Sequence, residues 1–141
     1  MDKQQKLTGL EIFTKYYFRI MAVMLLLALV FVAAPYAWMN SIHEWIGMGP
    51  LTDEPIVGYL ARSTSAFYAM LGGFIWFLAS DLRRYKPFLV FLSAVSILFA
   101  IAMLVIDIAE GMPRMWQVSE GPGGFILSLS FLLLSLKIKK I

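Results

Sequence analysis

Hydrophobic residues gather in four long runs along this chain, at about residues 17–39, 57–79, 88–106 and 123–136. Each run approaches the roughly 20 apolar residues that a helix needs to cross a hydrocarbon core about 30 Å thick. Polar residues lie between the runs and at the two ends of the chain. The pattern therefore predicts an all-α integral membrane protein, built as an antiparallel four-helix transmembrane bundle.

Proline, glycine and charged residues refine the expected helices to about residues 17–39, 55–79, 87–107 and 122–138. The remaining segments are short, so the whole chain, 1–141, is expected to be a single transmembrane domain.

The connections between these helices carry their own predictions. A tight loop over residues 80–87 makes the second and third helices antiparallel neighbours. Residues 41–46 are expected to form a short helix along the membrane interface. The segment over residues 108–124 is expected to be a loop, and its Gly-rich end, residues 120–124, a flexible turn.

Lysine and arginine are distributed unevenly about the four runs. An excess of these residues marks cytoplasmic loops, so the protein is expected to be a multi-pass protein of the bacterial inner membrane with both termini cytoplasmic. Ten of the twelve lie on the predicted inner side, namely Lys3, Lys6, Lys15, Arg19, Arg83, Arg84, Lys86, Lys137, Lys139 and Lys140. The other two, Arg62 and Arg114, fall on the outer half.

Composition narrows the chemistry. There is no cysteine, which removes disulfides, thiol redox chemistry and Cys-ligated metals. The single histidine, His43, cannot form a haem or zinc site without other strong ligands. No catalytic, metal or cofactor site is therefore expected. Because the basic residues flank apolar runs instead of forming one patch, nucleic-acid binding is not expected either.

Arg62 is the charged residue that does not fit a purely topological role, because it lies inside an apolar run. Charged residues within spanning helices usually face the bundle interior and have a partner. The same helix carries a small residue at every fourth position, and such a stripe favours close helix packing in lipid. We therefore expect Arg62 to point into the bundle along the stripe of Ala61, Ser65, Ala69 and Gly73.

The third helix offers a partner for Arg62. Its small and polar side chains follow helical spacing and end at Asp107, and Glu110 continues them by one turn. Arg62 lies about 27 Å beyond the inner loop and Asp107 about 30 Å, at 1.5 Å per residue. We therefore predict an Arg62–Asp107 ion pair with Glu110, Tyr59 or Ser63 as further partners. The expected stripe comprises Ser93, Ser96, Ala100, Met103 and Asp107.

Two interpretations of this polar site remain open. An ion pair can hold two helices in register. The same residues could instead form a polar pocket at the outer mouth of the bundle that binds an ion, a lipid headgroup or a small acid. Under the first interpretation, the double variant Arg62→Asp with Asp107→Arg should restore expression of the protein.

The sequence also resembles a family. Four short helices with both ends inside, Tyr59-Leu60-Ala61-Arg62 at the start of the second helix, the Arg83-Arg84 inner loop and Asp107 at the end of the third helix resemble the small bacterial DoxX-like four-helix membrane proteins and their uncharacterised relatives. The resemblance covers most of the chain from about Tyr16. It implies a small membrane subunit, in some members linked to thiosulfate or quinone oxidation, although no redox-competent residue of this chain matches.

Three functions follow from these observations, in order of preference. The first is a non-enzymatic accessory or scaffold subunit of a membrane assembly, with the lipid bilayer, further copies or other membrane subunits as partners. The second is a lipid or small-molecule binding or transport protein that uses Arg62, Asp107 and Glu110. The third is a quinone-linked redox accessory subunit.

Overall fold

The computed structural model describes residues 6–139, which form helices and no strands. Three stretches are long and apolar enough to cross a membrane, namely 9–33, 86–109 and 114–136. α4 is not among these stretches, although it is as long as α5. Its N-terminal half is less apolar because it contains Arg62, Ser63, Thr64 and Ser65. The elements in chain order are α1 (Gly9–Leu26), α2 (Leu29–Ala33), α3 (Tyr36–Trp45), α4 (Pro55–Leu78), α5 (Lys86–Ala109), α6 (Arg114–Ser119) and α7 (Gly121–Leu136).

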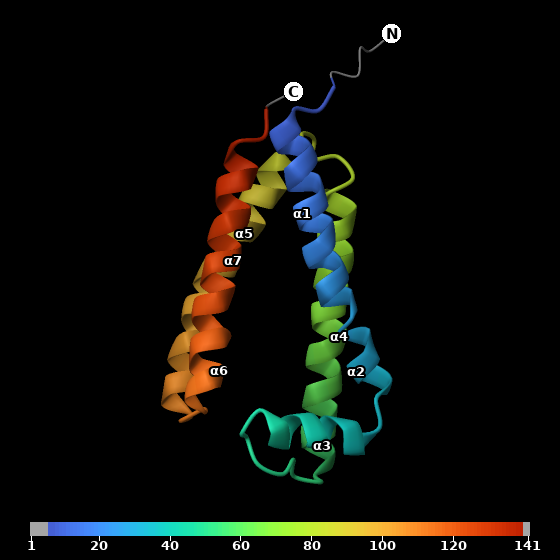
Figure 1. Cartoon of the computed structure of the whole chain (residues 1–141), viewed down its shortest axis with the longest axis vertical. Coiled ribbons are helices and arrows are strands. Elements are labelled where there is room, and N and C mark those ends of the chain that lie inside the picture. Colours follow the sequence, from blue (N-terminus) through green and yellow to red (C-terminus); the bar gives the residue numbers. More distant parts are fainter. Residues whose placement is uncertain (1–5, 140–141) are drawn as a thin grey trace.

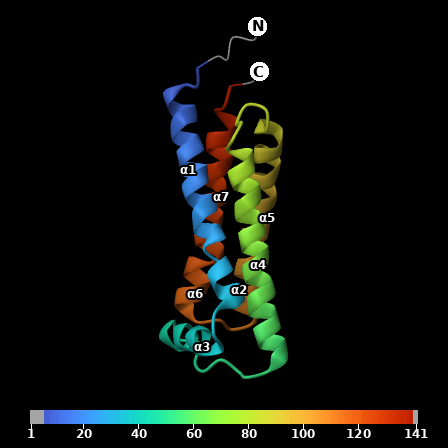
Figure 2. The same ribbon diagram turned by 90° about the vertical axis from the view of Figure 1, so that its right-hand side faces the viewer.

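The helices form two arms that meet at one end and separate at the other (Figure 1). α1 and α2 run along α4 in the N-terminal arm, and α6 and α7 run along α5 in the C-terminal arm. Following the predicted topology, we name the joined end, where α1 begins and α7 ends, the inner end. The prediction that the second and third helices are neighbours is wrong, because α4 packs along α1 and α5 along α7 (Figure 1). Seen from the side, the arms overlap and all the long helices run in the same general direction (Figure 2).

The first helix begins and ends earlier than the hydrophobic pattern predicts. Thr8 caps α1 through a capping box, in which its hydroxyl accepts from the Glu11 N–H and the Glu11 carboxylate accepts from the Thr8 N–H. The helical path ends at Ala33, because Ala34 adopts an extended conformation before Pro35, as residues before proline prefer. The predicted single helix over 17–39 is therefore corrected to α1, α2 and the start of α3.

The predicted short outer helix is present and is longer than expected. α3 lies across the outer end of the N-terminal arm, below α4 (Figure 1). Its loop is fixed by hydrogen bonds, since Tyr36 donates to the Leu51 carbonyl at 2.6 Å and Asn40 accepts from the Leu51 N–H at 2.6 Å. Partial burial raises the pKa of the Tyr36 phenol, and the nearby Asp53 carboxylate raises it further.

The predicted loop over residues 108–124 is largely helical. Gly111, with a φ of 67°, takes the left-handed conformation that commonly ends a helix, and the chain then reverses into α6. α7 begins at Gly121, with Pro122 in its first turn, so the expected flexible turn is instead the start of a helix. A Cβ at Gly121 would lie 2.6 Å from the Leu104 Cβ, so the glycine permits close contact between α5 and α7.

A small-residue face also joins α1 to α4. A Cβ at Gly72 would lie 2.7 Å from the Ala22 carbonyl oxygen, whereas a Cβ at Gly73 would meet nothing within 4 Å. The predicted stripe is confirmed at Ala69, which is buried, and wrong at Gly73, which is exposed. The reason is geometric, because a helix turns every 3.6 residues and a strict four-residue step drifts off the packing face.

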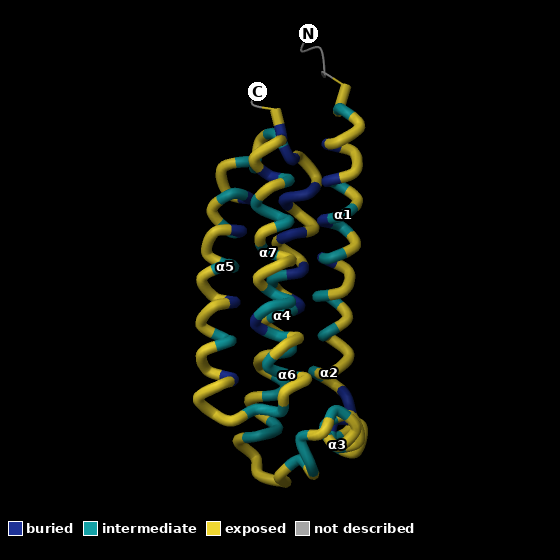
Figure 3. The backbone as a smooth tube through the Cα atoms, turned by 60° about the vertical axis from the view of Figure 1, so that its left-hand side comes forward, coloured by how far each residue is buried: buried dark blue, intermediate teal, exposed yellow. Residues whose placement is uncertain are grey.

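The exposed side chains on the outside of the two arms are largely apolar. Phe67, Phe91 and Leu98 are each more than 60% exposed, and exposed positions run along the outside of every helix (Figure 3). A surface of this kind is expected where helices contact lipid rather than water.

The two arms join through a core at the inner end. Phe18 of α1 is fully buried and lies 4.3 Å, between ring centroids, from Phe131 of α7. The Tyr17 and Ser130 hydroxyls share a hydrogen bond of 2.7 Å. The cluster comprises Phe18, Ala22, Ile75, Leu78, Ala79, Leu82, Leu89 and Ile138.

An ion pair closes this inner end. Glu11 is 1% exposed and accepts from Arg83 Nε at 2.9 Å and Nη2 at 2.8 Å. It also accepts from the Lys139 backbone N–H at 3.3 Å. The hydrogen bond to Glu11 raises the pKa of the Arg83 guanidinium. Glu11 therefore links the first helix, the inner loop and the chain after α7. The inner-side residues Lys3 and Lys140 lie outside the described residues.

Candidate functional site

Arg62 reaches across to α2 within its own arm. Its Nη1 donates to the Val32 carbonyl, and its Nη2 donates to the Ala34 carbonyl at 2.9 Å. These carbonyls lie at the end of α2, where the helix stops before Pro35 and leaves acceptors without helical partners. Arg62 therefore supplies hydrogen-bond donors to the helix end that Pro35 interrupts.

The predicted partner lies in the other arm. Asp107 on α5 is 2% exposed and faces α7. The side-chain ion pair found within residues 6–139 is that of Glu11 with Arg83, so the predicted Arg62–Asp107 pair is not formed. Arg62 and Asp107 were expected at similar distances from the inner loop, but this does not place them in contact. α4 and α5 belong to different arms, which separate toward the outer end (Figure 1).

The other predicted site residues are also dispersed. Glu110 is exposed at the end of α5, and Tyr59 is 66% exposed. Ser63 is exposed and donates to the Leu60 carbonyl of its own helix. The polar stripe on α5 is confirmed as an inward face, since Ser93, Ala100 and Asp107 are buried and Ser96 and Met103 half-buried. That stripe faces α7 and the space between the arms instead of pairing with Arg62.

Asp107 has a different neighbour, Glu120, which sequence reasoning placed in a flexible turn. The Glu120 carboxyl is near the Asp107 carboxyl and within hydrogen-bonding reach of the Trp116 side chain. Asp107 Oδ2 is buried without a hydrogen-bond partner. The sequence does contain a signal for the helix start at this point. Glu120 lies two residues before Pro122, as Asp53 lies two residues before Pro55 at the start of α4.

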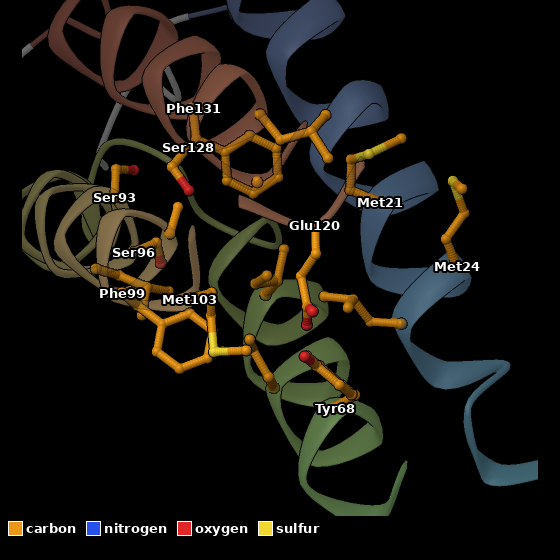
Figure 4. A pocket seen from close by; sticks show the side chains of 17 residues that line it. Met21, Met24, Tyr68, Ser93, Ser96, Phe99, Met103, Glu120, Ser128 and Phe131 are labelled. Carbon is orange, nitrogen blue, oxygen red and sulfur yellow. The ribbon is translucent and has the colours of Figure 1, made fainter. Parts of the chain in front are cut away.

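A cavity of about 420 Å³ lies between the two arms. Its wall is mostly apolar, and Glu120 and Tyr68 direct their oxygens into it from opposite arms (Figure 4). The hydroxyl-bearing residues Ser93, Ser96 and Ser128 add small polar positions to the wall. Side chains from α1, α4, α5 and α7 line the space, including Met21, Met24, Leu71, Phe99, Met103 and Phe131.

The cavity has the form of a small-molecule binding site. A cavity of several hundred Å³ with apolar walls and a few convergent polar groups is typical of a small-molecule site. Among residues 6–139 there is no group of three or more His, Cys, Asp or Glu residues that could hold a metal ion. His43 lies outside the cavity, where its Nδ1 forms a 2.8 Å hydrogen bond with the Gly49 carbonyl.

Comparison of the chain with models of protein families, with curated proteins and with solved structures finds no match. The resemblance to DoxX-like proteins therefore stays a prediction from the sequence.

Proposed function

We propose that this chain is a non-enzymatic integral membrane protein that binds an amphipathic molecule in the cavity between its arms. The observation that carries the proposal is the cavity itself, which is apolar along its wall and has Glu120 and Tyr68 directed into it from opposite arms. Such a space suits a molecule with an apolar body and one polar end. Binding of a lipid or small molecule was also the second function expected from the sequence, with its site at Arg62, Asp107 and Glu110 instead.

The proposal includes a four-span topology in a bacterial inner membrane, with both termini in the cytoplasm. Three helical stretches are apolar enough to span. α4 is the fourth, because it runs along α1 with 24 residues and would need to cross with it. Arg62 is tolerable in such a span because carbonyls of its own arm accept its hydrogen bonds.

Photo-crosslinking in liposomes tests the binding function. A long-chain alcohol that carries a diazirine on its chain should label cavity residues such as Met103 and Phe131. The substitution Ser128→Phe places a ring in the cavity and should reduce that labelling severalfold. Ser63→Phe is the matched control, because Ser63 is exposed and outside the cavity. Equal labelling of cavity peptides in the wild type and Ser128→Phe would count against the proposal.

An accessory-subunit role remains a second candidate, and one observation favours it. The arms contact each other through side chains near the inner end, such as Phe18 with Phe131, and are apart at the outer end (Figure 1). A helix of another membrane protein could occupy that space. Purification of the full chain in mild detergent distinguishes the two, since an accessory subunit should retain one partner protein in a fixed ratio.

A further inference from the structure

Two carboxyl groups from different elements meet at the outer end of the cavity. Asp107 comes from the end of α5, and Glu120 from the junction of α6 and α7. The chain reversal after Gly111 brings them together, because it returns α6 and α7 along α5. Glu120 lines the cavity, whereas Asp107 is 2% exposed and is not part of the cavity wall.

The Trp116 side chain donates to the Glu120 carboxyl, but one oxygen of Asp107 has no such donor. Asp107 Oδ2 is buried without a hydrogen-bond partner. Two ionised carboxylates carry acceptors only, so contact between them supplies no hydrogen bond while both are charged. Neither acid forms an ion pair with a lysine or arginine of residues 6–139. Buried charge of this kind is costly unless a partner neutralises it.

The surroundings specify what the missing group should be. It must donate hydrogen bonds, because the free positions are acceptors, and positive charge would offset the two acids. The Trp116 side chain already donates to Glu120, so the additional donor should serve the acceptor positions that remain. The rest of the cavity is apolar, so the donor should be the polar end of a larger apolar molecule.

We infer that Asp107 and Glu120 form a head-group site for a protonated primary amine carried by an amphipathic molecule. The inference rests on the proposed function, since the amine is the polar end of the molecule that fills the cavity. Glu120 meets the ammonium group from the cavity wall, and Asp107 adds its acceptors beside Glu120. The Tyr68 oxygen points toward Glu120 (Figure 4).

Three photo-crosslinking probes of equal chain length test the head-group preference. They carry the same diazirine and end in a primary amine, an alcohol or a carboxylic acid. Labelling of cavity peptides is divided by labelling of the lipid-facing residue Leu133, which corrects for different partition into the bilayer. The amine should label the cavity best and the acid least.

Charge-neutralising variants identify the residues responsible. Glu120→Gln and Asp107→Asn should each reduce amine labelling about tenfold or more, the effect expected for loss of a charged hydrogen bond. Labelling by the alcohol should change little. Glu110→Gln is the matched control, because that exposed acid lies on the same helix end. If Asp107→Asn does not fold, labelling of the Glu120→Gln variant alone tests the head-group preference, because Glu120 is only half-buried.

The outcomes separate the two proposals. If all three probes label the cavity equally well, the head-group inference is wrong and the binding function stands. The same holds if Glu120→Gln and Asp107→Asn both keep the preference for the amine probe. If no probe labels the cavity, both are wrong.

Discussion

At the scale of single residues, charges that look like topology markers have specific partners. Arg83 binds Glu11 at the inner end, and the Lys86 ammonium donates to the Leu136 carbonyl at 3.0 Å. The Arg19 guanidinium lies 5.0 Å from the Trp76 ring centroid. These residues therefore also connect elements that are distant in the sequence.

The sequence could predict some of this and not the rest. The motif Thr8-x-x-Glu11 is a readable capping box, which would have placed the start of α1 correctly. The partnership of Glu11 with Arg83, 72 positions away, depends on how the arms join and has no local signal. The burial of Asp107 was predictable from helical spacing, but its neighbour Glu120 was not, because that required the chain reversal at Gly111.

Exchange of charges between the predicted partners tests the role of Arg62. The double variant Arg62→Asp with Asp107→Arg should not restore folding, because Arg62 holds the carbonyls of Val32 and Ala34 and an aspartate cannot donate to them. Arg62→Met alone should lower stability by about 1–3 kcal/mol, the usual cost of losing partners for buried polar groups.

Thermal unfolding in detergent, with expression level as a second readout, measures both effects. Arg114→Met provides the control, since Arg114 is exposed at the start of α6. Recovery of wild-type stability in the charge-exchanged protein would instead support a direct Arg62–Asp107 pair.

At the scale of elements, the hydrophobic pattern located α4, α5 and most of α7, but it did not indicate which helices pack together. α5 is among the most apolar segments of the chain, yet nothing in its composition distinguishes α4 from α7 as its neighbour. The distinction lies in sites of close contact, where Gly121 meets Leu104 and Gly72 meets Ala22. Such contacts depend on the facing helix and are invisible in either segment alone.

Adjacent glycines on α4 test this account. Gly72→Ala should destabilise the protein, because its Cβ would meet the Ala22 carbonyl oxygen at 2.7 Å and the Leu26 nitrogen at 2.9 Å. An overpacked site of this kind typically costs about 1–3 kcal/mol. Gly73→Ala should be neutral or stabilising by up to about 1 kcal/mol, since alanine favours a helix and meets nothing there. Unfolding of both variants under one set of conditions gives the comparison, and equal stabilities would argue against close packing of α1 on α4.

At the scale of the whole molecule, the all-helical fold predicted from the sequence is confirmed, and its helices form two arms joined at the inner end. The four-helix transmembrane bundle stays a prediction. A tight loop between α4 and α5 suggested neighbouring helices, since short connections usually join elements that pack together. Here the loop is held by Arg83 against Glu11, and it joins the arms at their common end. The space between the arms is therefore a consequence of pairing α4 with α1 and α5 with α7.

The proposed topology can be tested with single cysteines, because the chain contains none of its own. Thr52 and Ser80 flank α4 and are exposed, and Glu110 is exposed after α5. In intact cells, a membrane-impermeant thiol reagent should label Thr52→Cys and Glu110→Cys. Ser80→Cys should react only after the membrane is permeabilised. Labelling of Thr52→Cys and Ser80→Cys from the same side would mean that α4 does not cross the membrane. The cavity would then lose its membrane-spanning wall, since α4 provides Tyr68, and the proposed binding of an amphipathic molecule within the bilayer would fail with it.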